Sequence, residues 1–277
     1  MQTFGILFHP KITKTTDIAR ELSLRLAEQA VHSWIASAWD EAEIRAKLGE
    51  TQMLITLGGD GTILRTARLS AGSDVPIAGV NFGRVGFLAE YQPEQLLSCV
   101  DDLVNGQFWL EERRMLHAEL WRADTQFGHY DALNDVVIGR GTVARVVRLR
   151  VVIDGTEPIH HTADGIIIAT PTGSTAYNVS AGGPIADPRV RVMIITPIAP
   201  HLSLLGPMIV PDSSNVEVWV ESDYPALVSM DGQVELRLES NDCVRVHTSH
   251  KVSRFVRTHP KEYFYAGLSR RLRLDAK

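Results

Sequence analysis

Short apolar runs alternate with helically spaced segments through the first part of the chain. The predicted strands are Thr3–Phe8, Val31–Ala36, Met53–Leu57 and Pro76–Val80. The predicted helices are Thr15–Gln29, a helix capped by Asp40 that runs to about Leu48, Ile63–Leu69, and about Pro93 to Asn105. Strands that alternate with helices predict an open parallel α/β sheet of the Rossmann-like kind.

The pattern changes at about Glu111, where short β-branched runs broken by Gly, Asp and Pro take over. These predicted strands are His117–Trp121, Ala132–Ile138, Val143–Ile153, Gly165–Ala169, Val216–Val220 and Val244–Thr248. This stretch has no long amphipathic helix, so it predicts an all-β domain of two packed sheets, a β-sandwich. The tail Glu262–Leu274 is helical again. We therefore expect an α/β domain over residues 1–110, a β-sandwich over 111–254, and a tail, 255–277, that docks back on the first domain.

Composition excludes several classes of protein. The net charge of −5 gives no basic field for a nucleic-acid partner. No apolar run approaches the roughly 20 residues that span a bilayer, so no membrane partner is expected. Met1–Phe8 becomes a strand at once and does not resemble a signal peptide. Cys99 and Cys243 are far apart, which argues against a disulfide framework and favours the reducing cytoplasm.

The first candidate site is the turn Gly58–Thr62, between a buried strand and a helix. Backbone amides of Gly58, Gly59, Gly61 and Thr62 can approach an anion there, and the start of the helix adds partial positive charge, so we predict a phosphate loop. The turn has no lysine. Its charged residue, Asp60, could hold Mg²⁺ or accept a proton from a hydroxyl that attacks phosphorus. The alternative is a tight turn with a capping Asp. Asp60 and Asn81 should both lie just past strand ends, where ligands of such sheets bind.

The second candidate site is the run Thr170–Pro184, which is rich in hydroxyls and small residues. Its donors and acceptors suit sugar hydroxyls, an adenine edge or phosphate, and Tyr177 offers a face on which a base can stack. The alternative is a loop whose hydroxyls satisfy one another. Asn134 and Asp135 place an amide and a carboxylate inside an apolar strand, where burial demands partners. Their alternative is a bulge or a turn at the end of a strand.

Two other sets of residues are weaker candidates for a functional site. His160 and His161 have no Cys or His at ligand spacing nearby, and a solvated loop is the better interpretation, so no metal-ligating residue is assigned. Arg145, Arg148 and Arg150 alternate along a strand, which is typical of a solvated face, although a ligand phosphate could bind Arg145.

Taken together, Gly58–Thr62, Asn134–Asp135, Asp164–Gly165, Ala169–Tyr177 and Ser180–Ile185 resemble bacterial NAD kinase, and Thr196–His201 is also similar. The likeness runs nearly end to end and includes the order of an α/β half and a β half. The first motif alone is shared with diacylglycerol and sphingosine kinases, whereas the Thr170–Tyr177 run is far more specific.

The resemblance implies transfer of the terminal phosphate of ATP, or of polyphosphate, to the adenosine-ribose 2′-hydroxyl of NAD. It also implies a divalent metal ion, most naturally Mg²⁺, and a homodimer or homotetramer. Asp60 would be the catalytic residue, and the first domain would hold phosphate while the second holds the dinucleotide. The residues that would bind NAD are Asp60, Gly61, Arg65, Asn134, Asp135, Arg145, Thr162, Asp164, Thr175, Ala176, Tyr177, Asn178, Val179, Ser180 and Gln233.

The chain departs from the family pattern at three positions. Asp135 stands where Glu is common, Gly206 where Arg often precedes the proline, and Thr162 where many members have a basic residue. These departures leave the preference between NAD and NADH open.

Two other functions compete with this interpretation. A lipid kinase would share the glycine turn but needs an apolar acceptor pocket. A non-catalytic dinucleotide sensor would be expected to lose the carboxylate of the turn, and Asp60 is present.

Overall fold

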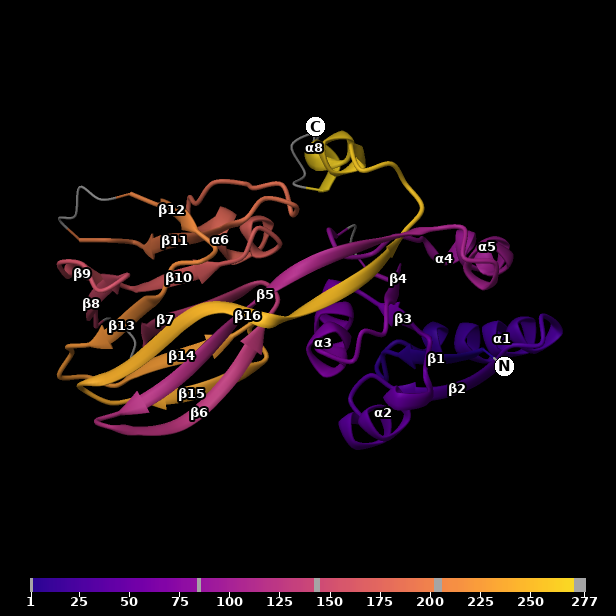
Figure 1. The fold of residues 1–277 in the computed structure, drawn as a ribbon, viewed down its shortest axis with the longest axis horizontal. Coiled ribbons are helices and arrows are strands. Elements are labelled where there is room, and N and C mark those ends of the chain that lie inside the picture. Colours follow the sequence, from indigo (N-terminus) through magenta and orange to yellow (C-terminus); the bar gives the residue numbers. More distant parts are fainter. Residues whose placement is uncertain (1, 84–85, 142–144, 202–205, 272–277) are drawn as a thin grey trace. The chain divides into compact units, whose positions relative to one another are not determined.

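The computed structural model describes residues 2–83, 86–141, 145–201 and 206–271. The chain divides into two compact units, Met1–Glu112 with Val252–Lys277, and Arg113–Lys251 (Figure 1). The sequence places these boundaries at 110/111 and 254/255. Each unit has its own apolar core, so each is described by itself.

The first unit is built on a parallel sheet with the strand order β2-β1-β3-β4-β16. Its strands are β1 (Thr3–Phe8), β2 (His32–Ser37), β3 (Met53–Gly58), β4 (Ile77–Asn81) and the end of β16 (Asp242–Arg257). Its helices are α1 (Thr13–Glu28), α2 (Glu41–Lys47), α3 (Asp60–Ser70), α4 (Pro93–Leu96), α5 (Val100–Val104), α7 (Tyr263–Ala266) and α8 (Leu268–Arg271).

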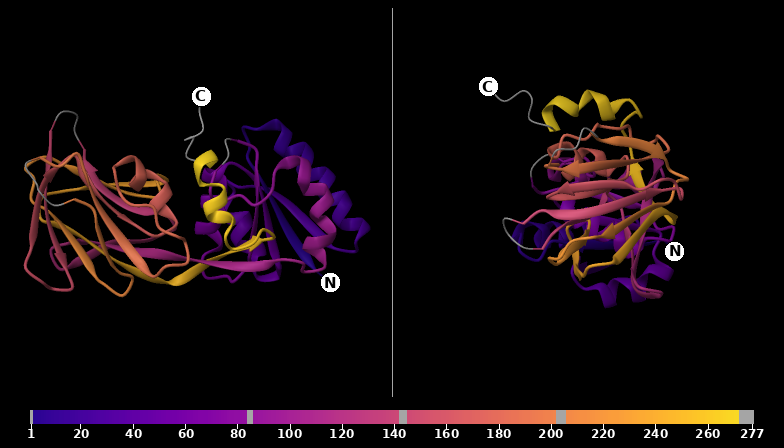
Figure 2. Two further views of the ribbon diagram at one scale, coloured as in Figure 1. Left: turned by 90° about the horizontal axis from the view of Figure 1, so that it is seen from above. Right: turned by 90° about the vertical axis from the view of Figure 1, so that its left-hand side faces the viewer.

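Helices cover both faces of this sheet, as buried parallel strands require. Ile55 and Leu57 of β3 pack into one core with α1, α4 and α5. In Figure 2, α1 and α5 lie along the same side of the strands. Thr56 faces the other way and bonds Thr66 of α3. Because alternate residues of a strand point to opposite faces, the apolar run of β3 serves both layers.

The helices begin and end at different residues from those expected. Asp40 caps α2 by accepting the Glu43 amide, as predicted, and its own amide donates to the Ser37 carbonyl. Helix α3 begins at Asp60, not at Ile63, so the glycine turn is shorter than predicted. The segment Pro93–Asn105 is not one helix but α4, a 3₁₀ turn and α5; it does end before Gly106, as expected.

The second unit is a sandwich of two antiparallel sheets, which confirms the expected fold class. One sheet joins β6, β5, β16, β13, β8 and β9, and the other has the order β12-β11-β10-β7-β14-β15. The further strands are β5 (Trp109–Arg122), β6 (Thr125–Ala132), β7 (Asp135–Arg140), β8 (Val147–Ile153), β9 (Ile159–Ala163), β10 (Gly165–Ala169), β11 (Val192–Ile198), β12 (Met208–Pro211), β13 (Val216–Val220), β14 (Ala226–Met230) and β15 (Val234–Leu238). The short helix α6 (Tyr177–Ser180) follows β10.

Several predicted strands of this unit were wrong in extent. Asn134 does not lie inside a strand, because the chain bends between the end of β6 at Ala132 and the start of β7 at Asp135. The predicted strand Val143–Ile153 begins at Val147, and its first two residues lie outside the described part. His161 lies in β9 and is buried, so it is not in a solvated loop. Burial, and to a smaller extent the neighbouring His160, lower the pKa of His161.

The strand β16 is far longer than the predicted run Val244–Thr248. Its first part pairs with β13 in the second unit, and its last part pairs with β4, with Phe255 opposite Ile77. The tail that follows belongs to the first unit, where Phe264 contacts Phe87. The tail helix is interrupted at Gly267, and Leu272 and Leu274 lie outside the described residues. No helix within the described ranges has the length and apolarity to cross a membrane.

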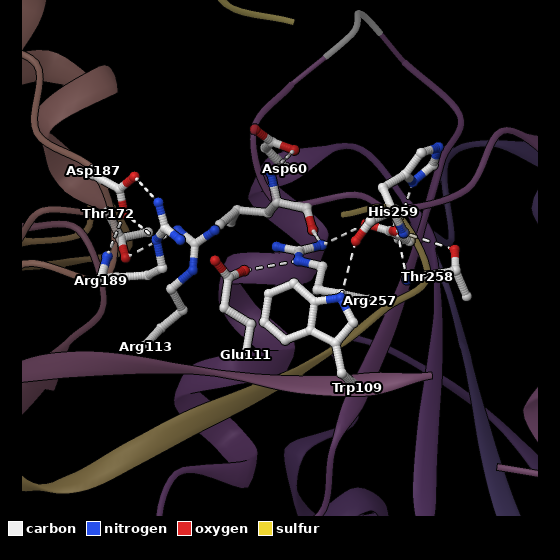
Figure 3. Close-up of polar contacts among 12 residues, drawn as sticks. Asp60, Trp109, Glu111, Arg113, Thr172, Asp187, Arg189, Arg257, Thr258 and His259 are labelled. Carbon is white, nitrogen blue, oxygen red and sulfur yellow. Dashed lines mark hydrogen bonds and ion pairs between the residues drawn. The ribbon is translucent and has the colours of Figure 1, made fainter. Parts of the chain in front are cut away.

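Arg257, the last residue of β16, is a buried charge with a full set of partners. Its guanidinium donates to Glu111 at 2.7 Å, to the Leu88 carbonyl at 2.9 Å and to Glu90 at 3.3 Å (Figure 3 shows the bond to Glu111). Glu90 also accepts the amides of Thr258 and His259. The network joins the loop after β4, the start of β5 and the end of β16.

We expect Arg257→Met to lower the free energy of unfolding by about 3–5 kcal/mol, because it leaves Glu90 and Glu111 buried without their cation. Urea unfolding of the full chain measures this loss. Arg20→Met is the matched control: Arg20 and Asp17 form an exposed pair 3.9 Å apart, and its loss should cost about 0–1 kcal/mol. Equal stability of the two variants would contradict the role given to Arg257.

Candidate functional site

Asp60 is the first residue of α3 and is held by the loop that follows β4. Its carboxylate accepts the Phe87 amide at 2.7 Å and the Leu88 amide at 3.3 Å. A Cβ on Gly86 would overlap this carboxylate, so only glycine lets the loop approach so closely. Asn81 is the last residue of β4 and not a residue past it; its side chain accepts the Gly83 amide. The segment Gly86–Leu88 therefore lies directly over Asp60.

The glycine turn leaves open space beside the start of α3. Apart from chain neighbours and the backbone of α3 itself, no described atom lies within 4 Å of a Cβ built on Gly59 or Gly61, and Gly59 has φ −89°, which any residue adopts. Packing and backbone geometry therefore do not require these two glycines. Gly58 closes β3, and Thr62 is buried in the first turn of α3. The space beside these glycines, at the N-terminus of α3, could accommodate an anion.

Arg65, on the same helix, is held by the chain after β2. Its Nε donates to the Ala38 carbonyl at 2.9 Å, and its guanidinium lies 5.5 Å from the centre of the Trp39 ring. Burial, and to a smaller extent the charge of the nearby Arg68, lower the pKa of Arg65.

In the second unit, Asp231 organises the bend between β6 and β7. Its carboxylate accepts the amides of Leu133, Asn134 and Asp135 at 2.8, 2.7 and 3.1 Å. Asp231 and Gly232 have φ of 55° and 62°, and Gln233 donates to Met230, which is the geometry of a type I′ turn between β14 and β15. The sequence did not predict this role for Asp231. The Asp-Gly pair signals the turn, but nothing local signals the bond to a bend about a hundred residues away.

Asp135 is buried beside this carboxylate. Burial, and then the charge of Asp231, raise the pKa of Asp135 to about 7. Three amide bonds stabilise the ionised form of Asp231, so the proton of the pair resides on Asp135. Near neutral pH the Asp135 carboxyl can therefore donate or accept a hydrogen bond.

A pocket of about 400 Å³ opens over these two carboxyl groups. Its lining consists of Asn134, Asp135, Val137, Ala176, Tyr177, Ser229, Asp231, Gly232 and Glu235. It brings together four residues predicted from the sequence: Asn134, Asp135, Ala176 and Tyr177. Tyr177 is 46% exposed, so it is not a core tyrosine, and its ring is available to a ligand. Gln233 directly follows the lining residue Gly232.

Most of the hydroxyls in the Thr170–Pro184 run are used inside the protein. Thr170 donates to the Leu133 carbonyl at 2.6 Å, and the Ser174 hydroxyl bonds both the amide and the carbonyl of Ala186. A Cβ on Gly173 would overlap the Asn134 carbonyl, so the run packs directly on the bend. For this inner part, the interpretation as a satisfied loop was the better one.

The Asn178 side chain belongs to that inner part. It is fully buried, donates to the carbonyls of Ser174 and Pro184, and accepts the Thr196 hydroxyl at 2.6 Å. We therefore reassign this side chain from binding a ligand to holding the loop. On the outer side, Ser180 is exposed, while Thr175 and Val179 are partly exposed.

Three predicted residues lie away from the pocket. Asp164 precedes β10 and pairs with Arg140 at 3.1 Å. Asp135 lies opposite Ala169 at one end of the β7–β10 pair, whereas Asp164 lies at the other end, roughly 14 Å or more along the strands at about 3.4 Å per residue. Thr162 lies in β9, and Arg145 is exposed with its guanidinium 4.9 Å from the centre of the Tyr224 ring.

Comparison with protein families gives two matches. Residues 14–108 match the ATP-NAD kinase N-terminal domain, and residues 133–258 match the ATP-NAD kinase C-terminal domain. Among curated relatives, the NAD kinase of Dehalococcoides mccartyi (strain ATCC BAA-2100) is 38% identical over 270 residues, 97% of this chain and 95% of the relative. The NAD kinase of Chloroflexus aggregans is 36% identical over 273 residues, 99% of each.

Two solved structures are similar along nearly the whole chain. Yeast NADH kinase complexed with NADH has a TM-score of 0.87 at 26% identity, and the match covers all of this chain and 89% of that one. An NAD kinase from Archaeoglobus fulgidus in complex with ATP has a TM-score of 0.78 at 26% identity, over 98% of this chain and 99% of that one.

The raised pKa of Asp135 predicts a stability that falls as the pH rises. The folded state keeps the proton up to about pH 7, while an unfolded Asp releases it near pH 3.8, so ionisation of the unfolded chain lowers the stability as the pH rises between these values. From about pH 5.5 to pH 8 this loss should be about 2 kcal/mol, at 1.4 kcal/mol per pKa unit. Urea unfolding of Asp135→Asn should show a smaller decrease over this interval than wild type. An equal decrease would show that Asp135 is not the responsible group.

Proposed function

Because the chain belongs to the ATP-NAD kinase family, we propose that it phosphorylates NAD, transferring the terminal phosphate of ATP, or of polyphosphate, to the 2′-hydroxyl of the adenosine ribose to give NADP. The observation that carries the proposal is the family match itself, which spans both units and includes both Asp60 and the residues of the pocket. The similarity to kinases solved with NADH and with ATP supports the same pair of substrates.

Asp60 is the residue that we assign to the chemistry. Its carboxylate is fixed by the Phe87 and Leu88 amides, so it does not need to be ordered when substrate binds. Two carboxylate oxygens offer about four acceptor positions, so the two amide bonds leave room for another partner. Asp60 would accept the proton of the ribose hydroxyl as its oxygen attacks the phosphate.

The residues around Asp60 also fit a divalent cation. Carboxylate and amide oxygens, here Asp60 and Asn81, are the hard ligands that Mg²⁺ prefers. The space beside Gly59 and Gly61 would take the phosphate groups. When bound, Mg²⁺ would offset the charge on the phosphate oxygens during transfer.

The pocket of the second unit would bind the dinucleotide. The exposed ring of Tyr177 offers a stacking surface, and Asn134 and Asp135, whose pKa is raised to about 7, offer donors and acceptors to ribose hydroxyls. Ala176 lines the same pocket, Thr175 and Gln233 adjoin lining residues in the chain, and Ser180 lies on the same short helix as Tyr177, so these residues would also contact the ligand.

We also propose that the enzyme works in the cytoplasm as a homo-oligomer. Both cysteines are free, as in a reducing compartment. Strand β12 ends its sheet among the described residues and carries Ile209, which is 57% exposed, so a second copy could add a strand at this edge. A second copy would also offer its Asp164 and Arg145, which lie far from this chain's own pocket. A monomeric mass in light scattering at micromolar concentration would contradict the oligomer.

We expect Tyr177→Ala to weaken NAD binding about 5- to 150-fold, the equivalent of the roughly 1–3 kcal/mol that a ring stacked on a base contributes. Its exposure predicts little change in melting temperature. Phe127→Ala removes another aromatic side chain of the same unit, 40% exposed, and should leave NAD affinity unchanged. Calorimetry with NAD measures both; a lower melting temperature of Tyr177→Ala with unchanged affinity would assign the ring to packing instead.

Wild type should form NADP from NAD, ATP and Mg²⁺, and Asp60→Asn should lower kcat by about 10²–10⁴ because the amide cannot accept the proton. NAD affinity should change little. Asp17→Asn, on the exposed face of α1, is the matched control and should retain full activity.

A magnesium titration separates the two roles of Asp60. A kcat that stays low at saturating Mg²⁺ supports the general base, and recovery of kcat at high Mg²⁺ supports a metal ligand. A near-normal kcat in Asp60→Asn would remove Asp60 from the chemistry, and the absence of NADP from wild type with any donor or divalent metal would refute the proposed function.

A further inference from the structure

A cluster of imidazole and carboxylate groups lies on the outer face of the second unit, on β5, β6 and β16. Leu116, Ala118 and Leu120 of β5 point into the core, so the alternate residues His117 and Glu119 point away from it. In the antiparallel pairing with β6, His117 lies opposite Asp131 and Glu119 lies opposite His129. The partner strand on the other side of β5, β16, contributes His247.

Three of these side chains converge. One ligand atom from each of His117, Glu119 and His247 lies within 4.8 Å of the other two. His247 Nε2 is 4.0 Å from Glu119 Oε1, and the rings of His117 and His247 have centroids 5.2 Å apart. Ligands of a tetrahedral zinc ion at about 2.0–2.1 Å would be roughly 3.4 Å apart, so torsional adjustments of about an ångström would close the site.

In both histidines a hydrogen bond at Nδ1 already fixes the orientation of the imidazole ring. His117 Nδ1 lies 2.9 Å from Asp131 Oδ1, and His247 Nδ1 lies 2.9 Å from the Thr248 carbonyl. A carbonyl and a carboxylate only accept, so each Nδ1 carries the hydrogen and each Nε2 keeps a free electron pair when the ring is neutral. A carboxylate or carbonyl behind each histidine is the arrangement that supports metal-binding histidines in proteins.

The neighbouring charges are already compensated. Lys251 pairs with Asp131 at 2.7 Å, and Arg245 pairs with Glu217 at 3.4 Å. Glu119 accepts the Trp121 indole N–H through Oε2, which leaves Oε1 toward His247. A cation at the cluster would therefore meet one uncompensated carboxylate and two imidazoles.

We propose that His117, Glu119 and His247 bind a divalent transition-metal ion, for which Zn²⁺ is the best match. Two imidazole nitrogens and one carboxylate oxygen suit Zn²⁺, whereas Mg²⁺ takes oxygen ligands. The site is thus distinct from any Mg²⁺ that serves phosphoryl transfer. A hollow of about 310 Å³, lined in part by Glu119 and His247, gives the ion a path from solvent and room for a water as fourth ligand. His129, whose ring centroid is 5.8 Å from that of His117, is the other candidate for this position.

The bound ion joins β5 to β16. These are the two strands along which the chain passes between its two units, at residues 112/113 and 251/252. An ion that binds the folded strands but not the unfolded chain raises the melting temperature, by an amount that grows with the logarithm of its concentration relative to its dissociation constant. The sequence alone does not indicate this site, because His117 and His247 are 130 positions apart.

The test uses the full chain, stripped with a chelator and dialysed against Zn²⁺. Metal analysis should find one Zn²⁺ per chain, and Co²⁺ in its place should give the intense visible absorption of a tetrahedral site. His117→Gln and His247→Gln should each weaken Zn²⁺ binding at least 10- to 100-fold, the loss that follows even from removing a group behind a ligand. Asp131→Asn should weaken it by about that amount.

His250→Gln is the matched control. His250 is exposed on the same strand, three residues from His247 and on the opposite face, so this variant should bind Zn²⁺ as wild type does. Zn²⁺ should raise the melting temperature of wild type and His250→Gln but not that of His247→Gln, while all three melt alike in chelator. Less than one Zn²⁺ per chain in wild type, or undiminished binding in both His117→Gln and His247→Gln, would overturn the proposal. An equal loss in His250→Gln would also overturn it.

Discussion

The guanidinium of Arg257 must keep its partners, because a cation with 7% of its surface exposed cannot be left without them. Its three bonds reach the loop after β4, β5 and, through Glu90, the chain after β16. Leu88 accepts from Arg257 with its carbonyl and donates to Asp60 with its amide. The buried charge and the candidate catalytic carboxylate are therefore connected through a single residue, and the position of Asp60 depends on the closure of the first unit by β16.

Three of the loops and bends described above are each held by a carboxylate that accepts hydrogen bonds from backbone amides. Asp60 holds Phe87 and Leu88, Glu90 holds Thr258 and His259, and Asp231 holds the bend that carries Asn134. An ionised carboxylate can satisfy several buried amides at once, which fixes a loop without regular secondary structure. In the pocket, such a carboxylate also has a chemical consequence, because the charge of Asp231 adds to the effect of burial in raising the pKa of the neighbouring Asp135.

The local pattern predicted the parts of the fold that depend on local chemistry. Strand β3, the cap of α2 by Asp40 and the change to a sandwich follow from hydrophobic period and side-chain type over a few residues. The start of α3 at Asp60 was missed because Gly61 and Thr62 are poor helix formers that tertiary packing overrides. Within the candidate site, Tyr177 and Asp135 were predicted, whereas Asp231 and the internal role of Asn178 were not. Those two are defined by partners in other strands, and no local rule specifies such pairings. The length of β16 was missed for the same reason, since its second half is specified by the sheet of the other unit.

The proposed reaction places a phosphate on the 2′-hydroxyl of the adenosine ribose of NAD. Phosphorus NMR of a mixture containing the purified protein, NAD, ATP and Mg²⁺ identifies the bond that forms. We expect a new 2′-phosphomonoester resonance that grows as ADP appears, and the product should serve an NADP-specific dehydrogenase. Phosphate released to water, or transferred to a different hydroxyl while NAD is left unchanged at its 2′ position, would contradict the proposed reaction.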